Sequence, residues 1–186
     1  MKPIEALFLD ENVYIFKEKD AQIIHDEKYF GKYIEFNNKN VLQLSVEETL
    51  FLIELERIVL KDNSAGKILT FEKFYAICSK DARELYQKYR VYRDLRKRGY
   101  IVKSGFKFGT HFRVYDKGVN PYKQGDKSKK EHTKYNVHAV SENDVFAYYE
   151  VSRYVRLSHN IRSVALMGVV DCEGEVTYYT VCRIKP

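Results

Sequence analysis

The chain has 186 residues, of which 45% are hydrophobic and 31% are charged, so it can bury a core and still remain soluble. No apolar run approaches the ~18–20 residues of a membrane span, and the short apolar run near the N-terminus is flanked by acids, unlike a secretory signal. The three cysteines show no CxxC spacing, which favours reduced thiols in a cytoplasmic protein over a zinc site or a disulfide framework.

The charge and the aromatic content together favour a nucleic-acid partner without proving one. The net charge is +6 and the pI is near 9.0, values that suit a polyanionic ligand. The chain also holds 16 Tyr and 11 Phe but no Trp. Tyrosine rings can stack on unpaired RNA bases, although most of these should belong to the core.

The first part of the chain predicts a small mixed α/β domain over residues 1–79. Four β-rich runs separated by polar turns predict short strands at 4–9, 13–16, 29–36 and 41–44. Ser45-Val-Glu-Glu48 is a capping box that opens a predicted helix to about Lys61, and Thr70 starts a shorter helix through Ile77. No catalytic-looking cluster occurs here, so we expect this domain to be structural.

The second part predicts an α/β domain over residues 80–186 with a mixed central sheet. A helix from Lys80 to Arg98 is expected from an apolar stripe, with Asp81 in its first turn and Gly99 at its end. Its other face is basic, through Lys88, Arg90, Arg93, Arg96 and Lys97. Strands are predicted at 100–102, 108–115, 134–140, 164–170 and 176–182, and a helix capped by Ser141 with Asp144 is predicted at 142–155.

Tyr115 and His132 are the first candidates for chemistry. Tyr115 ends a predicted strand, where its phenol could act as a base if nearby cations lowered its pKa, or could simply be a surface tyrosine. Histidine, whose ordinary pKa is ~6.5, can protonate a leaving oxygen at neutral pH. No other His, Cys or acid has metal-ligand spacing with His132 and His138, so neither a metal nor a cofactor is expected. We interpret His138 as structural.

Basic and acidic segments surround these two residues. The loop 117–134 carries six lysines, among them Lys127, Lys129 and Lys130, against two acids, and it could follow a phosphate backbone or be a solvated loop. Arg156 and Arg162, near a helix end, suit phosphate binding or base stacking, or form an exposed basic turn. An acidic hairpin turn is a candidate for docking on a basic partner surface, through Asp171, Glu173 and Glu175.

Four segments resemble the archaeal tRNA-splicing endonucleases (tRNA-intron endonucleases). They are YRVYRDLRKRGYIVKSGFKFGTHFRVY (89–115), HTKYNVH (132–138), SHNIR (158–162) and VVDCEGEVTYY (169–179). The resemblance is specific from about residue 80 onward and looser before it. It implies a nuclease-like C-terminal domain in an oligomer, either a homo-oligomer or a heterotetramer with a homologous subunit. It also implies metal-free cleavage of precursor tRNA at bulge–helix–bulge junctions, which leaves 2′,3′-cyclic phosphate and 5′-hydroxyl ends.

The resemblance also assigns roles to residues. Tyr115 matches the general base, His132 the general acid, and Arg156 an arginine that clamps a flipped base. The acidic turn at 171–175 matches a loop that inserts into an opposite subunit. Ser163 stands where the family carries a lysine that stabilises the transition state, and such preorganised charge is typically worth ~3–4 kcal/mol.

Three explanations account for Ser163. The chain could be the structural subunit of a heteromeric enzyme, which we slightly prefer. It could be active with Arg162 or a loop lysine as the substitute cation, or position 163 could carry an engineered change. Two other functions stay open: a non-catalytic RNA-binding or scaffolding subunit, and a metal-dependent nuclease of similar fold. The latter is disfavoured because the paired carboxylates and lysine of such sites are not apparent.

Overall fold

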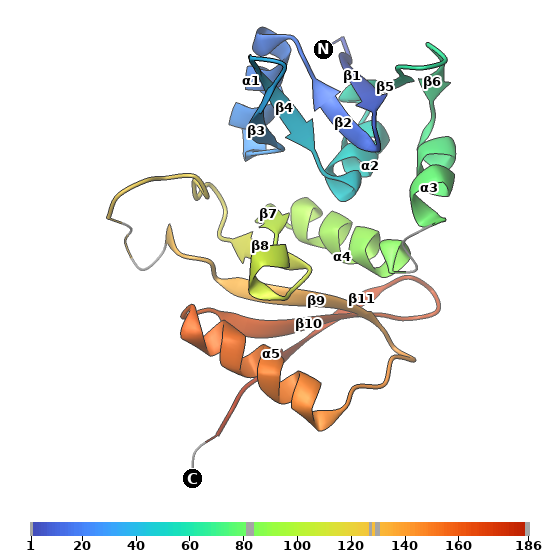
Figure 1. The fold of residues 1–186 in the computed structure, drawn as a ribbon. Helices are drawn as coiled ribbons and strands as arrows, with labels where there is room; N and C mark the ends of the chain where they lie inside the picture. The colour runs from blue at the N-terminus through green and yellow to red at the C-terminus, as the bar shows by residue number, and fades with distance from the viewer. Residues whose placement is uncertain (1, 81–83, 127, 129–130, 185–186) are drawn as a thin grey trace. The chain divides into compact units, whose positions relative to one another are not determined.

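The structure is a computed structural model, and it describes residues 2–80, 84–126, 128 and 131–184 (Figure 1). The chain divides into two compact units, residues 1–83 and 84–186. Each unit has its own sheet and its own buried core, so each is described by itself. The prediction of a mixed α/β fold is confirmed in both.

The N-terminal unit is a six-stranded mixed sheet with three helices. The strand order is β3-β4-β2-β1-β5-β6, with β1 and β5 parallel and the other pairs antiparallel. The strands are β1 (Ile4–Leu9), β2 (Asn12–Ile15), β3 (Lys32–Phe36), β4 (Lys39–Leu44), β5 (Ile58–Asp62) and β6 (Ile68–Leu69). The helices are α1 (Glu18–Lys28), α2 (Val46–Glu54) and α3 (Phe71–Ser79). Fully buried side chains such as Ile15, Leu42 and Phe74 form the core.

Two features of this unit differ from the sequence prediction. Helix α1 was not expected, because its sequence is mostly polar and only Ala21 and Ile24 are buried. The helix predicted to reach Lys61 ends at Glu54, although its capping box at Ser45 is present as expected. The chain reverses at Glu56, with a positive φ, and residues 58–62 then become β5 because their alternating apolar side chains are buried in the sheet.

The C-terminal unit is a five-stranded sheet in the order β11-β10-β9-β8-β7. Only β9 and β10 are parallel; the other neighbouring pairs are antiparallel. The strands are β7 (Ile101–Ser104), β8 (Phe112–Tyr115), β9 (Tyr135–Ser141), β10 (Val164–Val170) and β11 (Val176–Val181). Helix α4 (Leu85–Lys97) packs on β7, β9, β10 and β11, and α5 (Tyr148–Asn160) packs on β10 from the other side (Figure 1).

Both helices of this unit begin later than predicted. Lys80 is the C-cap of α3, and α4 begins at Leu85, the first buried residue of its apolar stripe. Asp81, predicted in the first turn of this helix, lies outside the described residues. Ser141 does not cap α5. Its backbone N–H instead donates to Asp144 Oδ2 at 2.8 Å, and this hydrogen bond closes a turn before the helix. Helix α5 begins at Tyr148 and runs past the predicted end to Asn160. Arg156 therefore lies inside a helix.

The strand predicted from residue 108 also starts later. Residues 106–108 form a short 3-10 helix, and Gly109 turns the chain with φ +63° before β8 begins at Phe112. A β-carbon at Gly105 would lie 2.2 Å from Thr110 Oγ1, so this turn is closely packed. The late start leaves β8 with four residues that end at Tyr115.

Candidate active site

Three strand ends meet at one end of the C-terminal sheet. Strand β8 ends at Tyr115, and Val114 is paired with Tyr135, the first residue of β9. Tyr135 is also paired with Val164, the first residue of β10. Tyr115 and Ser163, which directly precedes β10, therefore lie at the same end of the sheet.

The backbone of Lys134 connects these strand ends. Its N–H donates to the Val114 carbonyl at 2.8 Å, and its carbonyl accepts from Val164 N–H at 3.0 Å. Val114, next to Tyr115, and Val164, next to Ser163, are thereby both hydrogen-bonded to the backbone of Lys134. His132 lies two residues before Lys134, in an exposed bend.

The environments of the candidate residues differ. Tyr115 is only 3% exposed, so it is not the surface tyrosine that the sequence allowed. Ser163 is half-buried, and both its N–H (3.0 Å) and its hydroxyl (3.3 Å) donate to the Ser158 carbonyl at the end of α5. Ser163 is therefore a neutral side chain directed toward helix backbone.

The ammonium of Lys134 is already engaged. Its Nζ lies 2.7 Å from Asp116 Oδ1 and 5.6 and 5.4 Å from the ring centroids of Tyr100 and Tyr135. The hydrogen bond to Asp116 is the largest cause that raises the pKa of Lys134. Lys134 thus stays charged at neutral pH, and its charge is neutralised by the residue that follows Tyr115.

The loop 117–134 is partly described. Lys123 Nζ pairs with Glu131 Oε1 at 2.6 Å, and Ser128 N–H donates to the other carboxylate oxygen of Glu131 at 2.7 Å. The bond from Lys123 is the main cause that lowers the pKa of Glu131 to about 2. Lys127, Lys129 and Lys130, predicted to contact RNA, lie outside the described residues.

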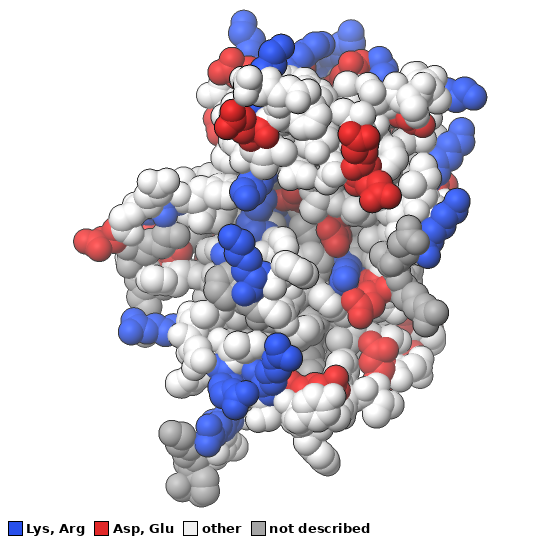
Figure 2. All heavy atoms as spheres, viewed as in Figure 1, with Lys and Arg blue, Asp and Glu red and all other residues white. Residues whose placement is uncertain are grey.

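Arg156 lines a groove between α5 and the edge strand β11. The groove has a volume of about 540 Å³ and is lined by Tyr148, Val151, Ser152, Val155, Arg156, Val181, Cys182 and Arg183. Figure 2 shows basic side chains gathered over α5 and the C-terminal segment of the chain. The groove thus combines apolar walls with two guanidinium groups.

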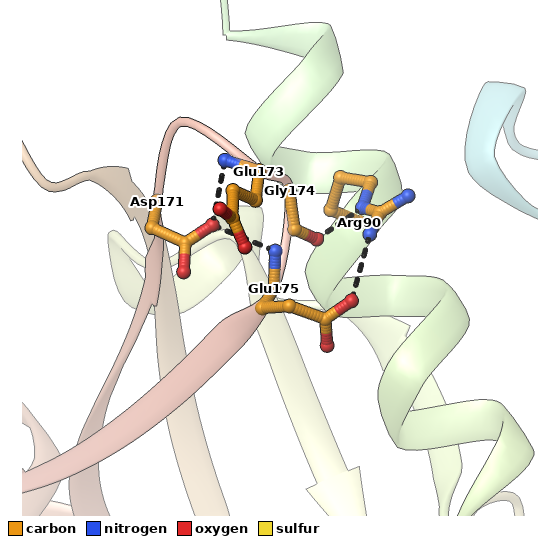
Figure 3. Close-up of polar contacts among 5 residues, drawn as sticks. All are labelled: Arg90, Asp171, Glu173, Gly174 and Glu175. Carbon is orange, nitrogen blue, oxygen red and sulfur yellow. Dashed lines mark hydrogen bonds and ion pairs between the residues drawn. The ribbon is translucent and has the colours of Figure 1, made fainter.

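The acidic turn forms the hairpin between β10 and β11 and is held by its own unit (Figure 3). Asp171 Oδ1 accepts from the N–H groups of Glu173 (3.0 Å) and Glu175 (2.9 Å). Arg90 of α4 donates from Nε to the Gly174 carbonyl at 2.5 Å, and its Nη2 lies 3.8 Å from Glu175 Oε1. Asp171 therefore shapes the turn, whereas the Glu175 side chain remains 80% exposed.

Not all of the basic residues predicted on one face of α4 are exposed to solvent. Arg96 is 2% exposed, donating to Tyr92 Oη (2.8 Å) and to the Val102 carbonyl (3.0 Å). Arg90 is committed to the hairpin. The charge pattern of a helix does not distinguish a buried, satisfied arginine from an exposed one.

Sequence reasoning missed a partly buried histidine pair. The rings of His111 and His138 are 4.9 Å apart, and His138 lies 4.4 Å from the ring of Tyr154. His111 Nδ1 accepts from Ala139 N–H at 3.0 Å and its Nε2 is 3.3 Å from Glu84 Oε2. Burial lowers the pKa of His111 to about 4 and also lowers that of His138. Only the three-dimensional fold joins these residues, since no sequence spacing relates His111 to Glu84.

The described part of the chain contains no group of three or more His, Cys, Asp or Glu side chains arranged to hold a metal ion. None of its helices is long and apolar enough to cross a membrane.

Comparison with known proteins adds family membership to this geometry. The tRNA intron endonuclease catalytic C-terminal domain matches residues 85–178, and the N-terminal domain of the same enzymes matches residues 3–75. The chain belongs to the tRNA intron endonuclease family. The C-terminal match includes Tyr115, His132 and Ser163.

Curated members of the family align over nearly the whole chain. A tRNA-splicing endonuclease from Methanothermobacter thermautotrophicus is 38% identical over 184 residues, covering 98% of this chain and 99% of that protein. One from Thermococcus onnurineus is 35% identical, covering 99% and 98%. One from Methanosarcina mazei is 34% identical over 97% of this chain, which corresponds to 48% of that protein.

Proposed function

We propose that this chain is a cytoplasmic subunit of a tRNA-splicing endonuclease that cleaves precursor tRNA at bulge–helix–bulge intron junctions. The observation that carries the proposal is the bridging backbone of Lys134. It joins the strand that ends at Tyr115 to the strand that follows Ser163, within the segment similar to the family's catalytic domain. His132 precedes this bridge in the chain.

The proposed chemistry is an intramolecular attack by the RNA. Tyr115 takes the proton of the 2′-hydroxyl, and the resulting oxygen attacks the adjacent phosphorus. The bond from phosphorus to the 5′-oxygen breaks, and His132 gives that oxygen a proton. The products are a 2′,3′-cyclic phosphate and a 5′-hydroxyl, and no metal is part of the proposed steps. Each positioned acid or base typically contributes a factor of ~10²–10⁴.

The charge distribution supports this unit as the one that binds RNA. Residues 84–186 hold 20 Lys and Arg against 11 Asp and Glu, a net charge of +9, whereas residues 1–83 carry −3. We propose that Arg156 and Arg162, with the lysines of the loop, contact the RNA. Phosphate contacts of this kind produce strongly salt-dependent binding.

We further propose that the chain acts in an oligomer, as a homo-oligomer or with a homologous subunit. The hairpin carrying Asp171, Glu173 and Glu175 would dock on a basic surface of another subunit. Because Arg90 and Asp171 fix the backbone of the hairpin, little conformational entropy remains to be lost on docking. Glu173 and Glu175 would supply most of the exposed negative charge.

A second candidate function is a non-catalytic RNA-binding or scaffolding subunit. The observation that favours it is Ser163, a neutral side chain that donates to helix backbone at the end of the sheet. A subunit of this kind would still bind RNA after Tyr115→Phe and His132→Ala, and would cleave nothing alone.

Cleavage of an intron-containing precursor tRNA by the purified chain, with EDTA present, tests these alternatives. Clean excision with cyclic-phosphate ends is the result expected for a self-sufficient enzyme. No cleavage alone, restored by a homologous subunit that carries the lysine, would make this chain the structural half. No cleavage in either case would overturn the nuclease function and leave RNA binding.

A further inference from the structure

The proposed nuclease function calls for a cation at the end of the sheet that carries Tyr115. Attack on a phosphodiester concentrates negative charge on the phosphate oxygens in the transition state, and preorganised positive groups stabilise that charge. Ser163 is neutral and donates to the backbone of α5. The ammonium of Lys134 is paired with Asp116 at 2.7 Å.

Arg162, next to Ser163, has an unusual backbone conformation. Its φ is +56°, in the left-handed region, and it is the one non-glycine residue with positive φ among the described residues of the C-terminal unit. Its N–H donates to the His159 carbonyl (3.0 Å), while Ser163 N–H donates to the Ser158 carbonyl (3.0 Å). This is the Schellman ending of a helix, in which glycine is the favoured residue at the left-handed position.

Helix α4 ends in the same way but with the favoured residue. Gly99 has φ +91°, its N–H donates to the Arg96 carbonyl (2.9 Å), and Tyr100 N–H donates to the Leu95 carbonyl (3.1 Å). Two helices of one unit thus end with the same hydrogen bonds, one on glycine and one on arginine. Glu56 at the end of α2 has the same conformation, so the feature that distinguishes Arg162 is its place next to the strand end that carries Ser163.

The side chain of Arg162 is available for such a function. It is exposed, and its guanidinium has no hydrogen bond or ion pair within the described part of the chain. Two residues after Arg162, the N–H of Val164 donates to the carbonyl of Lys134. The N–H of Lys134 in turn donates to the carbonyl of Val114, the residue before Tyr115. A guanidinium is planar and permanently charged, which suits it to grip two oxygens of one phosphate.

We propose that Arg162 is a catalytic residue that contacts the scissile phosphate and supplies the positive charge that Ser163 cannot. The proposal rests on the nuclease function proposed above. Arg162 stabilises the negative charge on the phosphate oxygens, and it transfers no proton.

The substitution Arg162→Gly separates this function from folding. Glycine relieves the backbone strain, so the melting temperature of the variant should equal or exceed that of the wild type. Single-turnover cleavage of precursor tRNA should nevertheless fall by about 10²–10³. The loss should appear in the rate at saturating enzyme, with a smaller change in RNA affinity.

Matched variants supply the controls. Helix α2 ends on the same motif at Glu56, with φ +54°, so Glu56→Gly makes the same backbone change in the N-terminal unit and should leave cleavage unaltered. Arg153→Gln removes an exposed positive charge from α5 and should also be silent. Adding Ser163→Lys to Arg162→Gly should restore most of the lost rate, because it returns a cation to the neighbouring position.

The outcomes separate this proposal from the proposed function. A wild-type chain that cleaves, together with an Arg162→Gly variant that cleaves equally fast, would overturn the assignment of Arg162 and leave the nuclease function standing. A wild-type chain that cleaves only with a lysine-bearing partner subunit would also overturn it, while keeping this chain as a subunit. A chain that never cleaves under any condition would overturn both.

Discussion

The two units of this protein use similar elements for different purposes. Among the described residues of the N-terminal unit, the buried polar side chains are Glu48 and Thr49, both in the first turn of α2 beside its cap. In the C-terminal unit buried polar groups extend across the sheet, including Asn136 and Ser158 between β9 and α5. The first unit carries a net charge of −3 and the second +9. Positive charge thus concentrates in the C-terminal unit, which also carries the residues proposed to act in catalysis.

The largest expected effect of a single substitution is on the proposed base and acid. Tyr115→Phe and His132→Ala should each reduce cleavage by ~10²–10⁴ while RNA binding stays near the wild-type level. Tyr14→Phe, which alters a buried tyrosine of the N-terminal unit, should leave the rate unchanged. Gel-resolved single-turnover assays measure the rates, and filter binding measures affinity. If Tyr14→Phe and Tyr115→Phe reduced the cleavage rate equally, the proposed functional difference between the two units would be contradicted.

The next largest effect concerns the hairpin. Gly174→Ala places a β-carbon 2.5 Å from Tyr86 Oη and 2.9 Å from Arg90 Cζ, at a residue with φ +81°. We expect a loss of ~1–3 kcal/mol in the free energy of unfolding, with weakened oligomerisation. Denaturant unfolding and analytical ultracentrifugation check both. Gly66→Ala, at a glycine of the N-terminal unit with φ +63° and open space, carries only the backbone strain and should leave oligomerisation intact.

The partly buried histidine pair should give the C-terminal unit a distinctive pH dependence. The pKa of His111 is about 4 in the folded state, below its ordinary value of 6.5. The unfolded chain therefore takes up a proton first as pH falls, and stability is lost between about pH 6.5 and pH 4. Thermal unfolding followed by circular dichroism should show this loss, and it should be weaker in His111→Gln. His25→Gln, in the other unit, is the control, and an unchanged pH profile in His111→Gln would contradict the prediction.

The smallest expected effect is on RNA affinity. Arg156→Ala should weaken binding of precursor tRNA, and it should reduce the slope of log K against log salt by ~1 if the residue contacts a phosphate. Lys19→Ala, in the N-terminal unit, should change neither quantity. Fluorescence anisotropy at several salt concentrations measures both. A salt slope that falls equally for both variants would mean that RNA binding is shared by the two units.

Local signals in the sequence predicted much of the fold. The capping box at Ser45, the cap at Thr70 and the apolar run of β10 each gave an element where it was expected. The errors arose where a local signal had two structural uses. Ser141 and Asp144 have the spacing of a helix cap but close a turn, and Ile58 continues the helical spacing of Leu50 and Ile53 yet lies in a strand.

The site was predictable only in part. The pattern of residues offered Tyr115 and His132 as candidates, and the family resemblance added Ser163. Neither indicated that Lys134 joins the strand ends or that its ammonium pairs with Asp116. Those contacts depend on strand register, which a sequence does not state. The left-handed conformation of Arg162 was likewise hidden, because nothing in its neighbours distinguishes a Schellman ending from a continuing helix.

The most direct test of the central claim uses a precursor tRNA with 2′-deoxyribose at the nucleotides before each splice junction. The wild-type protein should cleave the all-ribose substrate and leave 2′,3′-cyclic phosphate ends. It should bind the deoxy substrate with similar affinity and leave it uncut, because the attacking oxygen is missing. Cleavage of the deoxy substrate at a comparable rate would contradict 2′-hydroxyl attack and the roles assigned to Tyr115 and His132.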